Sequence, residues 1–334
     1  FLALDLPVTG LVSGRLPLGG VTPRMTGEGD LVFEQTRLWG QPFDRVEGRL
    51  GFESDRLRFT GVRGTLGSGT ARLDGLYRYD DDGYEVEAGA QDLPLERLGA
   101  VVEGAPGLTG RITGSVSGRG TLDDPRLRLA GTIAQPAWKG QPLALPGDPA
   151  TLRLTLEEGA LDAEADAPGA ARLKAEGRNG KIALGLEVRS IAAYSNLLGI
   201  PPGTALDGTA SLQARLVEDA DGNVASANGR LESLDATLGP HRIFLPAPAS
   251  FEWSDGRVRW AGVRVAAQRT MGGAGALPEG ELVLNGDLQT GDEGALSARA
   301  AGTVEAALLT PFLGGASLEG RLDVSATASG TVDR

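Results

Sequence analysis

Few residues of this chain have the types and spacing that catalysis or metal binding needs. There is one histidine, His241, in the sequence Gly-Pro-His-Arg at residues 239–242. A single histidine supplies neither a full set of metal ligands nor a catalytic triad. Cysteine is absent, which excludes disulfides, thiolate ligands and cysteine nucleophiles. We therefore interpret His241 as a hairpin residue.

Carboxylates cluster at two places. Asp123 and Asp124 are adjacent, and adjacent side chains on an extended segment point to opposite sides. Pro125 follows them directly, which favours a turn that starts the next strand over a catalytic or calcium-binding pair. The run Asp-Asp-Asp-Gly at residues 80–83 has weak calcium binding as an alternative, but a solvated hairpin tip is the better interpretation.

Two glycine-rich segments resemble catalytic motifs but lack the residues or the spacing that define those motifs. Residues 110–120 lack the preceding hydrophobic strand and the Gly-Lys-Ser/Thr ending of a phosphate loop. Gly-Ser-Val-Ser-Gly at residues 114–118 does not have the spacing of a nucleophile elbow. No enzyme class is indicated, so we expect a protein that is not an enzyme and that uses no cofactor and no metal.

The elements that would position these residues are β-strands. Apolar and polar residues alternate along the whole chain, and a period of two indicates strands with one apolar and one polar face. Turn sequences separate the strands at residues 80–83, 158–159, 178–180, 221–223 and 254–256. The pattern predicts an all-β fold.

The amino-acid composition and the net charge limit the kinds of protein and partner to be expected. Glycine makes up 51 of 334 residues, about twice its usual share of ~7%. Single glycines between alternating segments argue against collagen and against a flexible linker. The net charge is −12 with no concentrated basic stripe, which excludes nucleic acid as the expected partner. No stretch of 18 apolar residues occurs. We expect an internal segment of a larger protein, because the chain lacks an initial Met and stops in mid-pattern.

A repeat of about one hundred residues runs through the sequence. Its copies open at Gly29, Gly131 and Gly229, and each continues into a hairpin sequence, at residues 38–43, 138–143 and 238–243. Short helix-like patches lie between the copies, at residues 93–102, 191–198 and 304–313. We predict repeats at residues 1–92, 93–190 and 191–303 and the start of another at 304–334, all in one continuous elongated β domain.

Two phrases carry a resemblance to a known family. Gly-Thr-Leu-Asp-Asp-Pro-Arg-Leu at residues 120–127, followed by Trp-Lys-Gly-Gln-Pro-Leu at 138–143, resembles the TamB family within the AsmA-like group. Trp-Gly-Gln-Pro-Phe at residues 39–43 echoes the second phrase. The chain departs from the family's pattern at two places. Glu-Asp-Ala-Asp-Gly at residues 218–222 replaces the Asp-Pro-Arg phrase, and the chain ends at residues 332–334, where another copy of that phrase would begin. The spacing of strands and turns resembles the family along the whole chain, but few specific residues carry the resemblance.

The resemblance implies a fold, a place and partners. TamB-like proteins are anchored in the inner membrane and cross the periplasm as a β-sheet curled into a U-shaped trough with an apolar lining. They meet an outer-membrane barrel protein, TamA, and are linked to outer-membrane protein assembly and phospholipid movement. The implied partners are phospholipid acyl chains, a TamA-type barrel and unfolded outer-membrane protein strands. The anchor would lie outside this segment.

The apolar strand faces are the candidate site, and two interpretations of them stay open. In one they line a groove for lipid; in the other they are the core of a closed structural or adhesive β-solenoid. A carbohydrate-active β-helix enzyme is a third alternative, but no cleft of carboxylates can be assembled for it. The expected lining residues are Leu127, Leu129, Ile133, Leu152, Leu154, Leu156, Phe251, Trp253, Val258, Trp260, Leu282 and Leu284.

Overall fold

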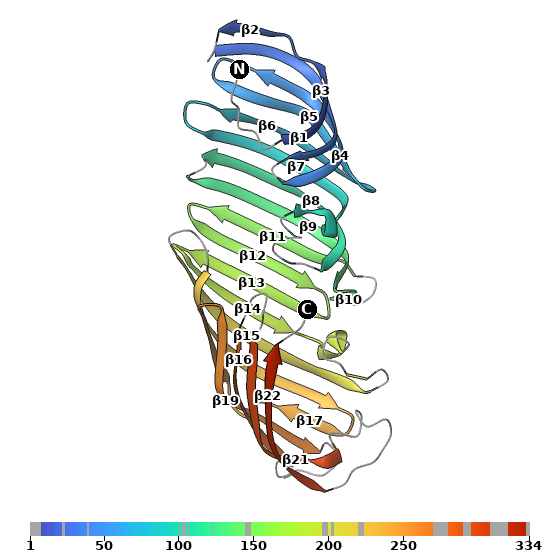
Figure 1. Ribbon diagram of the computed structural model, residues 1–334, viewed down its shortest axis with the longest axis vertical. Coiled ribbons are helices and arrows are strands. Elements are labelled where there is room, and N and C mark those ends of the chain that lie inside the picture. The colour runs from blue at the N-terminus through green and yellow to red at the C-terminus, as the bar shows by residue number, and fades with distance from the viewer. Residues whose placement is uncertain are drawn as a thin grey trace. The chain divides into compact units, whose positions relative to one another are not determined.

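The computed structural model confirms the all-β prediction. It describes residues 8–21, 24–38, 40–99, 101, 105, 107–121, 123–143, 148–195, 200–201, 204–219, 224–269, 280–289, 295–307 and 320–331. Strands take up 79% of these described residues and helical segments 4%. The chain divides into two compact units, Phe1–Pro168 and Gly169–Arg334. Each is built on antiparallel sheet (Figure 1).

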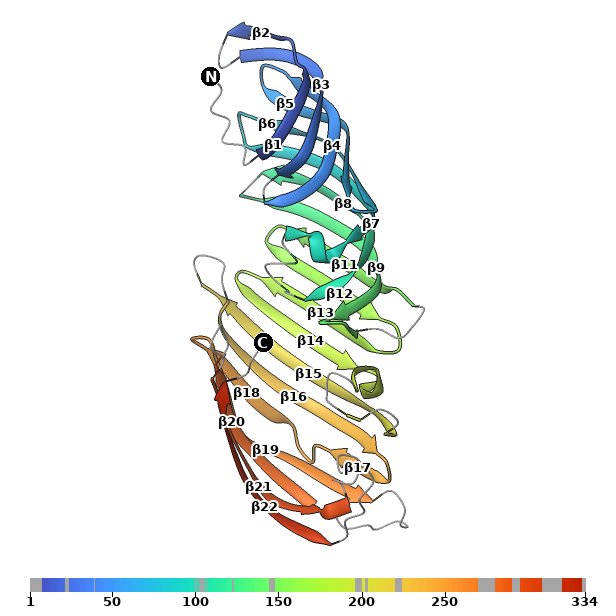
Figure 2. The same ribbon diagram turned by 45° about the vertical axis from the view of Figure 1, so that its right-hand side comes forward.

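In the first unit the long strands from β3 to β11 each pair with the long strands before and after them in the chain. The short strands β2 and β10 add to β3 and β9. Figure 2 shows β3 and β4 bent along their length. The elements are β1 (Val8–Arg15), β2 (Leu18–Val21), β3 (Arg24–Leu38), β4 (Gln41–Phe52), β5 (Arg56–Leu66), β6 (Gly69–Arg78), β7 (Gly83–Pro94), the 3₁₀ turn η1 (Leu95–Arg97), β8 (Leu108–Thr121), β9 (Pro125–Trp138), β10 (Gln141–Pro142), β11 (Ala150–Glu157) and β12 (Ala160–Ala167).

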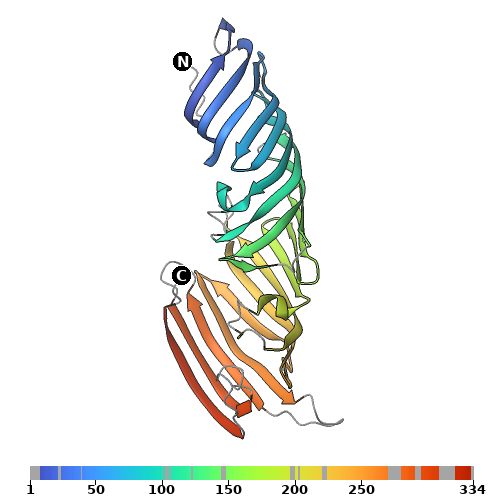
Figure 3. The ribbon, with the colours of Figure 1, turned by 90° about the vertical axis from the view of Figure 1, so that its right-hand side faces the viewer.

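The second unit repeats this plan. Its last strands, β19 to β22, lie side by side in chain order (Figure 3, orange to red). The elements are β13 (Ala171–Arg178), β14 (Lys181–Val188), the 3₁₀ turn η2 (Ile191–Tyr194), β15 (Leu206–Glu218), β16 (Val224–Leu238), β17 (His241–Phe244), β18 (Ala249–Ser254), β19 (Arg257–Arg269), β20 (Gly280–Gln289), β21 (Ala295–Glu305) and β22 (Arg321–Thr331).

The predicted turns have the expected backbone. Glu158, Asn179 and Asp255 each have φ near +50° and are each followed by a glycine with φ near +70°. Two successive positive φ angles define the type I′ turn, whose twist matches that of the flanking strands. The turns predicted at residues 80–83 and at Asp123-Asp124 also lie between strands. The turn predicted at residues 221–223 lies outside the described residues.

The predicted repeat is confirmed in the strand register. The closing pairs of the three repeated hairpins are Leu38 with Gln41, Trp138 with Gln141, and Leu238 with His241. The same hairpin therefore recurs every hundred residues. The predicted repeat boundaries stay a prediction, and the division into compact units falls elsewhere, between residues 168 and 169.

Details of the first two copies also coincide. Gln35 and Gln135 both have positive φ, at 47° and 51°. A register shift accompanies each of them, against β1 in one copy and β8 in the other. The glycines facing these shifts, Gly10 and Gly110, have φ of +132° and +144°. A side chain at either would be strained, which explains glycine at both positions.

The predicted helical patches contain helical residues, and two of them begin later than expected. In the first, Leu95–Arg97 form a 3₁₀ turn and Gly99 and Val101 are α-helical; in the second, Ile191–Tyr194 form a 3₁₀ helix, and residues 196–198 lie outside the described part. Residues 93–94 belong to β7, because Leu93 still pairs with Ile112 of β8. In the third patch β21 continues to Glu305, residues 306–307 form a 3₁₀ turn, and residues 308–313 lie outside the described part.

Two strands are bent by a bulge of the same design. The register shifts around Gly61 in β5 and around Gly262 in β19, and both glycines have positive φ. The freed amide of Gly61 donates to Asp74 Oδ1 at 2.6 Å, and that of Gly262 donates to Asn285 Oδ1 at 2.8 Å. Bulges bend a strand and increase its twist, so these side chains fix local curvature.

Candidate functional site

One face of the sheet is apolar without interruption in each unit. Residues directly opposite each other in an antiparallel ladder share a face, so the register identifies side-chain neighbours. Followed from strand to strand, this register gives lateral rows in which every member is apolar or glycine.

Three such rows cross the first unit from β5 to β12. Each contains one residue from every long strand on the way. The rows are Gly64, Ala71, Ala90, Gly114, Gly131, Leu152 and Ala165; Val62, Leu73, Ala88, Val116, Leu129, Leu154 and Ala163; and Phe59, Gly75, Val86, Gly118, Leu127, Leu156 and Leu161.

Two rows cross the second unit from β13 to β22. They pass through β18 and do not include β17. The rows are Ala175, Leu184, Ala214, Gly229, Phe251, Trp260, Gly286, Ala298 and Ala328; and Gly177, Ile182, Leu216, Ala227, Trp253, Val258, Leu288, Leu296 and Gly330.

The twelve residues expected from the sequence lie on these faces, six in each unit. In the first unit Leu127 is opposite Leu156, and Leu129 is opposite Leu154. Their strand neighbours Leu152 and Ile133 oppose Gly131 and Ala150.

In the second unit Phe251 is opposite Trp260, and Trp253 is opposite Val258. Leu282 and Leu284 pair with the valines of β19, Val265 and Val263. The register thus brings the expected residues together within each unit. That they line a groove stays a prediction.

These faces are only half-buried. The side chains of all twelve expected residues are partly exposed, and none is fully buried. The chain exposes 20337 Å² in total. Two separate compact domains of half its 34.5 kDa mass would together expose about 16,000 Å². The excess agrees with single-layer sheets whose apolar faces have no second layer across them.

Glycines on the apolar face lie beneath large side chains of the next strand. A Cβ on Gly229 would lie 1.9 Å from Cζ of Phe251, and one on Gly286 would lie 2.5 Å from Cζ2 of Trp260. Both aromatic residues are the direct cross-strand partners of these glycines. The rings therefore lie flat over glycine instead of standing up from the sheet. A ring that lies flat occupies less of the space above the face than one that stands up from it.

Full burial is concentrated along one edge of each unit, which we call the helical rim because it carries the 3₁₀ turns. In the first unit it is the edge where β5 and β7 end; in the second it is the edge where β14, β16, β19 and β21 end. Leu57, Ala214 and Ala227 are exceptions. The buried residues along it are Thr36, Val46, Leu66, Leu93, Leu95 and Ala150 in the first unit, and Ala170, Ile191, Ala236, Leu238, His241, Ala249, Ala266, Ala267, Val304 and Ala306 in the second.

A polar latch closes the helical rim of the first unit. Arg97, at the end of η1, donates to both carboxylate oxygens of Asp44 in β4, at 2.8 and 3.3 Å. Asp44 also accepts the amide of Gly67 at 2.5 Å. The Gln41 side chain donates to the Arg97 carbonyl at 3.1 Å and accepts the Gly99 amide at 2.8 Å. The segment after β7 is thus tied to β4, three strands away.

The latch also perturbs its carboxylate. The hydrogen bond from Arg97, followed by that from the Gly67 amide, holds the pKa of Asp44 below its ordinary value. The same pairing raises the pKa of Arg97. Both groups are charged at neutral pH, so the latch is closed there. Leu95, in the same 3₁₀ turn as Arg97, is 2% exposed.

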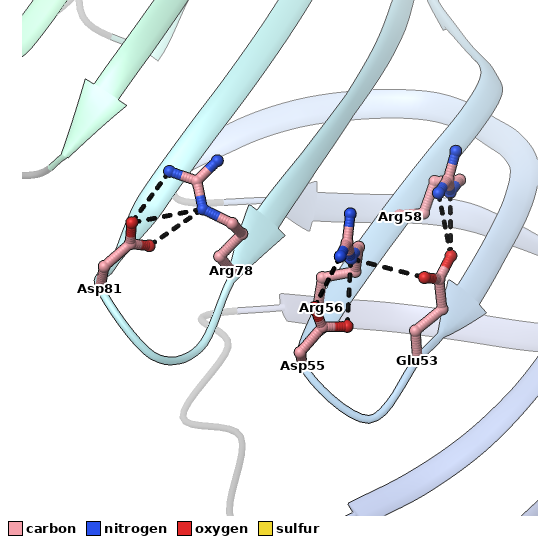
Figure 4. Close-up of polar contacts among 6 residues, drawn as sticks. All are labelled: Glu53, Asp55, Arg56, Arg58, Arg78 and Asp81. Carbon is pink, nitrogen blue, oxygen red and sulfur yellow. Dashed lines mark hydrogen bonds and ion pairs between the residues drawn. The ribbon is translucent and has the colours of Figure 1, made fainter.

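The opposite edge of the first unit, the hairpin rim, is made of tight turns that carry charges. Figure 4 shows two of these turns. Arg78 pairs with Asp81 at 3.0 Å, Arg56 with Asp55 at 2.6 Å, and Arg58 with Glu53 at 3.0 Å. The amide of Tyr79 donates to the Asp55 carbonyl at 2.9 Å, which joins the two turns.

The other face of the sheet is polar. Cross-strand pairs such as Arg49 with Asp30, at 2.9 Å, and Arg45 with Glu34, at 3.0 Å, cover it in the first unit. Twist makes a sheet saddle-shaped, and this polar face has hollows. One in the second unit has a volume of about 790 Å³ and is lined by both positive and negative side chains. Such a lining selects no ligand by charge.

The residues first considered for chemistry have structural positions. His241 is 3% exposed and closes the third repeated hairpin opposite Leu238. The Asp124 amide donates to Thr121 Oγ1 at 3.1 Å, which stabilises the turn before β9. Among the described residues no three His, Cys, Asp or Glu side chains are grouped to hold a metal ion. No helix in that part of the chain is long and apolar enough to cross a membrane.

Sequence reasoning missed the latch and the glycine-covering rings. The latch joins residues more than fifty positions apart, and one clue to it was the glutamine of the repeated Gly-Gln-Pro phrase, at Gln41 and Gln141. The ring over Gly229 becomes visible only once β16 and β18 are paired.

Comparison of this chain with protein-family models, with curated proteins and with solved structures finds no match.

Proposed function

We propose that this chain is a non-enzymatic conduit or scaffold of the bacterial cell envelope whose apolar face binds phospholipid acyl chains. The observation that supports this is the set of uninterrupted apolar rows, in which every Leu, Ile, Val, Phe and Trp side chain stays partly exposed while only small residues are fully buried. A closed adhesive solenoid would instead seal such rows in a core.

Binding would act by solvation. Each CH₂ group that leaves water for an apolar surface contributes about 0.8 kcal/mol, so a long acyl chain is held without polar recognition along its length. A lateral row crosses the strands and presents similar side chains at each step. A lipid would therefore find no single deep site, which permits movement from strand to strand.

The resemblance to the TamB family supports the setting of this proposal. In that setting the chain is the periplasmic part of a protein anchored in the inner membrane. It acts with an outer-membrane barrel of the TamA type. It carries phospholipid between the membranes, handles unfolded outer-membrane protein strands, or does both.

A pair of substitutions on one strand tests the lipid face. Leu154 lies on the apolar face between Leu129 and Ala163, whereas Thr151 lies on the polar face between Thr132 and Asp166. Leu154→Arg should abolish or strongly reduce co-purifying lipid, because it places a charge in a row that has none. Thr151→Arg adds the same charge to the same strand and should leave lipid content unchanged.

The measurement is lipid extraction and mass spectrometry after purification from a bacterial periplasm, with circular dichroism to show that both variants keep their β-content. Equal lipid in wild type and Leu154→Arg would count against the apolar face as the binding surface. Wild-type lipid no higher than in a β-rich control protein would favour the closed adhesive scaffold.

A further inference from the structure

Aromatic side chains gather where the apolar face of the first unit meets the hairpin rim. Three of the chain's four tyrosines lie there: Tyr77, Tyr79 and Tyr84. Tyr77 is opposite Leu57 on one side and opposite Tyr84 on the other. The neighbouring row begins beside them at Phe59. This end of the face thus joins the apolar rows to the charged turns.

Tyr77 and Tyr79 form an open aromatic corner. Their ring centroids are 6.1 Å apart and the ring planes meet at 71°. Tyr79 is 39% exposed, and the Tyr77 hydroxyl is fixed by a hydrogen bond to Asp82. Two perpendicular rings with an accessible face are the arrangement in which proteins bind ammonium groups by cation–π attraction.

The charge around this corner is negative. The two turns shown in Figure 4 contain five carboxylates, at Glu53, Asp55, Asp80, Asp81 and Asp82, against three arginines, at Arg56, Arg58 and Arg78. The balance is 3 − 5 = −2. Each arginine is already paired with a carboxylate of its own turn, which leaves surplus negative charge.

This charge acts directly on the tyrosines. The hydrogen bond to Asp82 raises the pKa of Tyr77, with a further contribution from burial. Burial and the Asp55 carboxylate raise the pKa of Tyr79. A negative potential at an aromatic surface attracts a cation and repels an anionic headgroup.

We propose that this corner binds the ammonium group of a phospholipid headgroup while the acyl chains of the same lipid lie on the adjoining apolar rows. The inference rests on the proposed lipid-binding function and adds a headgroup preference to it. It fits an amine-bearing zwitterionic lipid because the aromatic corner, the surplus carboxylates and the apolar face are continuous.

The test uses the full chain and three lipids with identical dioleoyl tails: phosphatidylethanolamine, phosphatidylglycerol and diacylglycerol. Bound lipid is quantified by native mass spectrometry from an equimolar mixture. We expect wild type to prefer phosphatidylethanolamine over phosphatidylglycerol by roughly two- to fivefold, the size of an exposed cation–π contact. Tyr79→Leu should lose the preference while still binding diacylglycerol, and Tyr79→Phe should retain it.

The matched control is Trp138→Leu. Trp138 is an aromatic residue of the same unit, 43% exposed, at the opposite end of the strands. It should leave the headgroup preference unchanged. Equal binding of the three lipids by wild type, or an intact preference in Tyr79→Leu, would overturn the headgroup site but leave lipid binding standing. Absence of all three lipids from wild type would overturn the proposed function itself, and the headgroup site with it.

Discussion

The flat-lying ring of Phe251 yields a prediction that can be worked out from distances. In Gly229→Ala the new Cβ would lie 1.9 Å from Cζ and 2.4 Å from both Cε atoms of Phe251, so the ring must move. Overpacking of this kind costs about 1–3 kcal/mol. The displaced ring would rise from the sheet into the space above the apolar face. We therefore expect lower stability and less bound lipid.

A glycine of the same unit provides the matched control. Gly185 lies in β14 between Lys174 and Gln213 on the polar face, and a Cβ there has no neighbour within 4 Å. Because glycine in a strand loses more conformational freedom on folding than alanine, Gly185→Ala should stabilise the unit by about 0.5–1 kcal/mol. The same chemical change should thus have opposite signs at the two positions.

Urea unfolding followed by circular dichroism measures both effects, and both substitutions report on the second unit. A double-mutant cycle sharpens the test. In a Phe251→Ala background the ring is gone, so Gly229→Ala should no longer destabilise, giving a coupling of about 1–3 kcal/mol. If Gly229→Ala stabilises the unit as Gly185→Ala does, or if the coupling is near zero, the ring does not lie over Gly229.

Further predictions concern the bulge and the latch of the first unit. Asp74→Ala should lower the free energy of unfolding in urea by about 1 kcal/mol, because the Gly61 amide loses its acceptor. Asp74→Asn should be nearly neutral, since an asparagine accepts the corresponding hydrogen bond at the equivalent bulge of the second unit. Equal losses in the two variants would contradict the role of Asp74 as the acceptor for the bulge. Because the pKa of Asp44 is lower in the folded chain, its contribution to stability is fully present above the unfolded value of about 3.9 and is lost as the pH falls from there through the lower folded value. Arg97→Met removes the main cause of that shift, so its stability should fall less than wild type between pH 7 and pH 3, and identical acid profiles would argue that the latch does not form.

The sequence was enough for the strands and their faces, because these depend on local alternation. Leu152, Leu154 and Leu156 fix the apolar side of β11 whatever that strand pairs with. The type I′ turns were equally readable, since Asn179-Gly180 and similar pairs favour positive φ. The repeat was visible because its hairpin sequences recur.

Features that depend on pairing across many residues were not readable. Arg97 could have served as any surface cation, and only the curl of the sheet brings it to Asp44. The aromatic corner depends on Tyr79 projecting from a turn, where strand alternation no longer assigns a face. The division of the apolar face into a buried helical rim and a half-open remainder needs the same three-dimensional information, because alternation marks a side chain as apolar but not as covered.

The hundred-residue spacing of the closing pairs has a consequence for how such a chain changes in evolution. Removal of residues 39–138 would join Leu38 to Lys139 and rebuild the same closing pair, Leu38 with Gln141, without turning any later strand over. Insertion of a further copy at the same point would do likewise. Recombination between repeats could therefore change the number of strands in whole steps while the apolar rows stay in register. Under the proposed conduit function, copy number, and not substitution, would then be the inherited variable that sets how far the apolar rows extend.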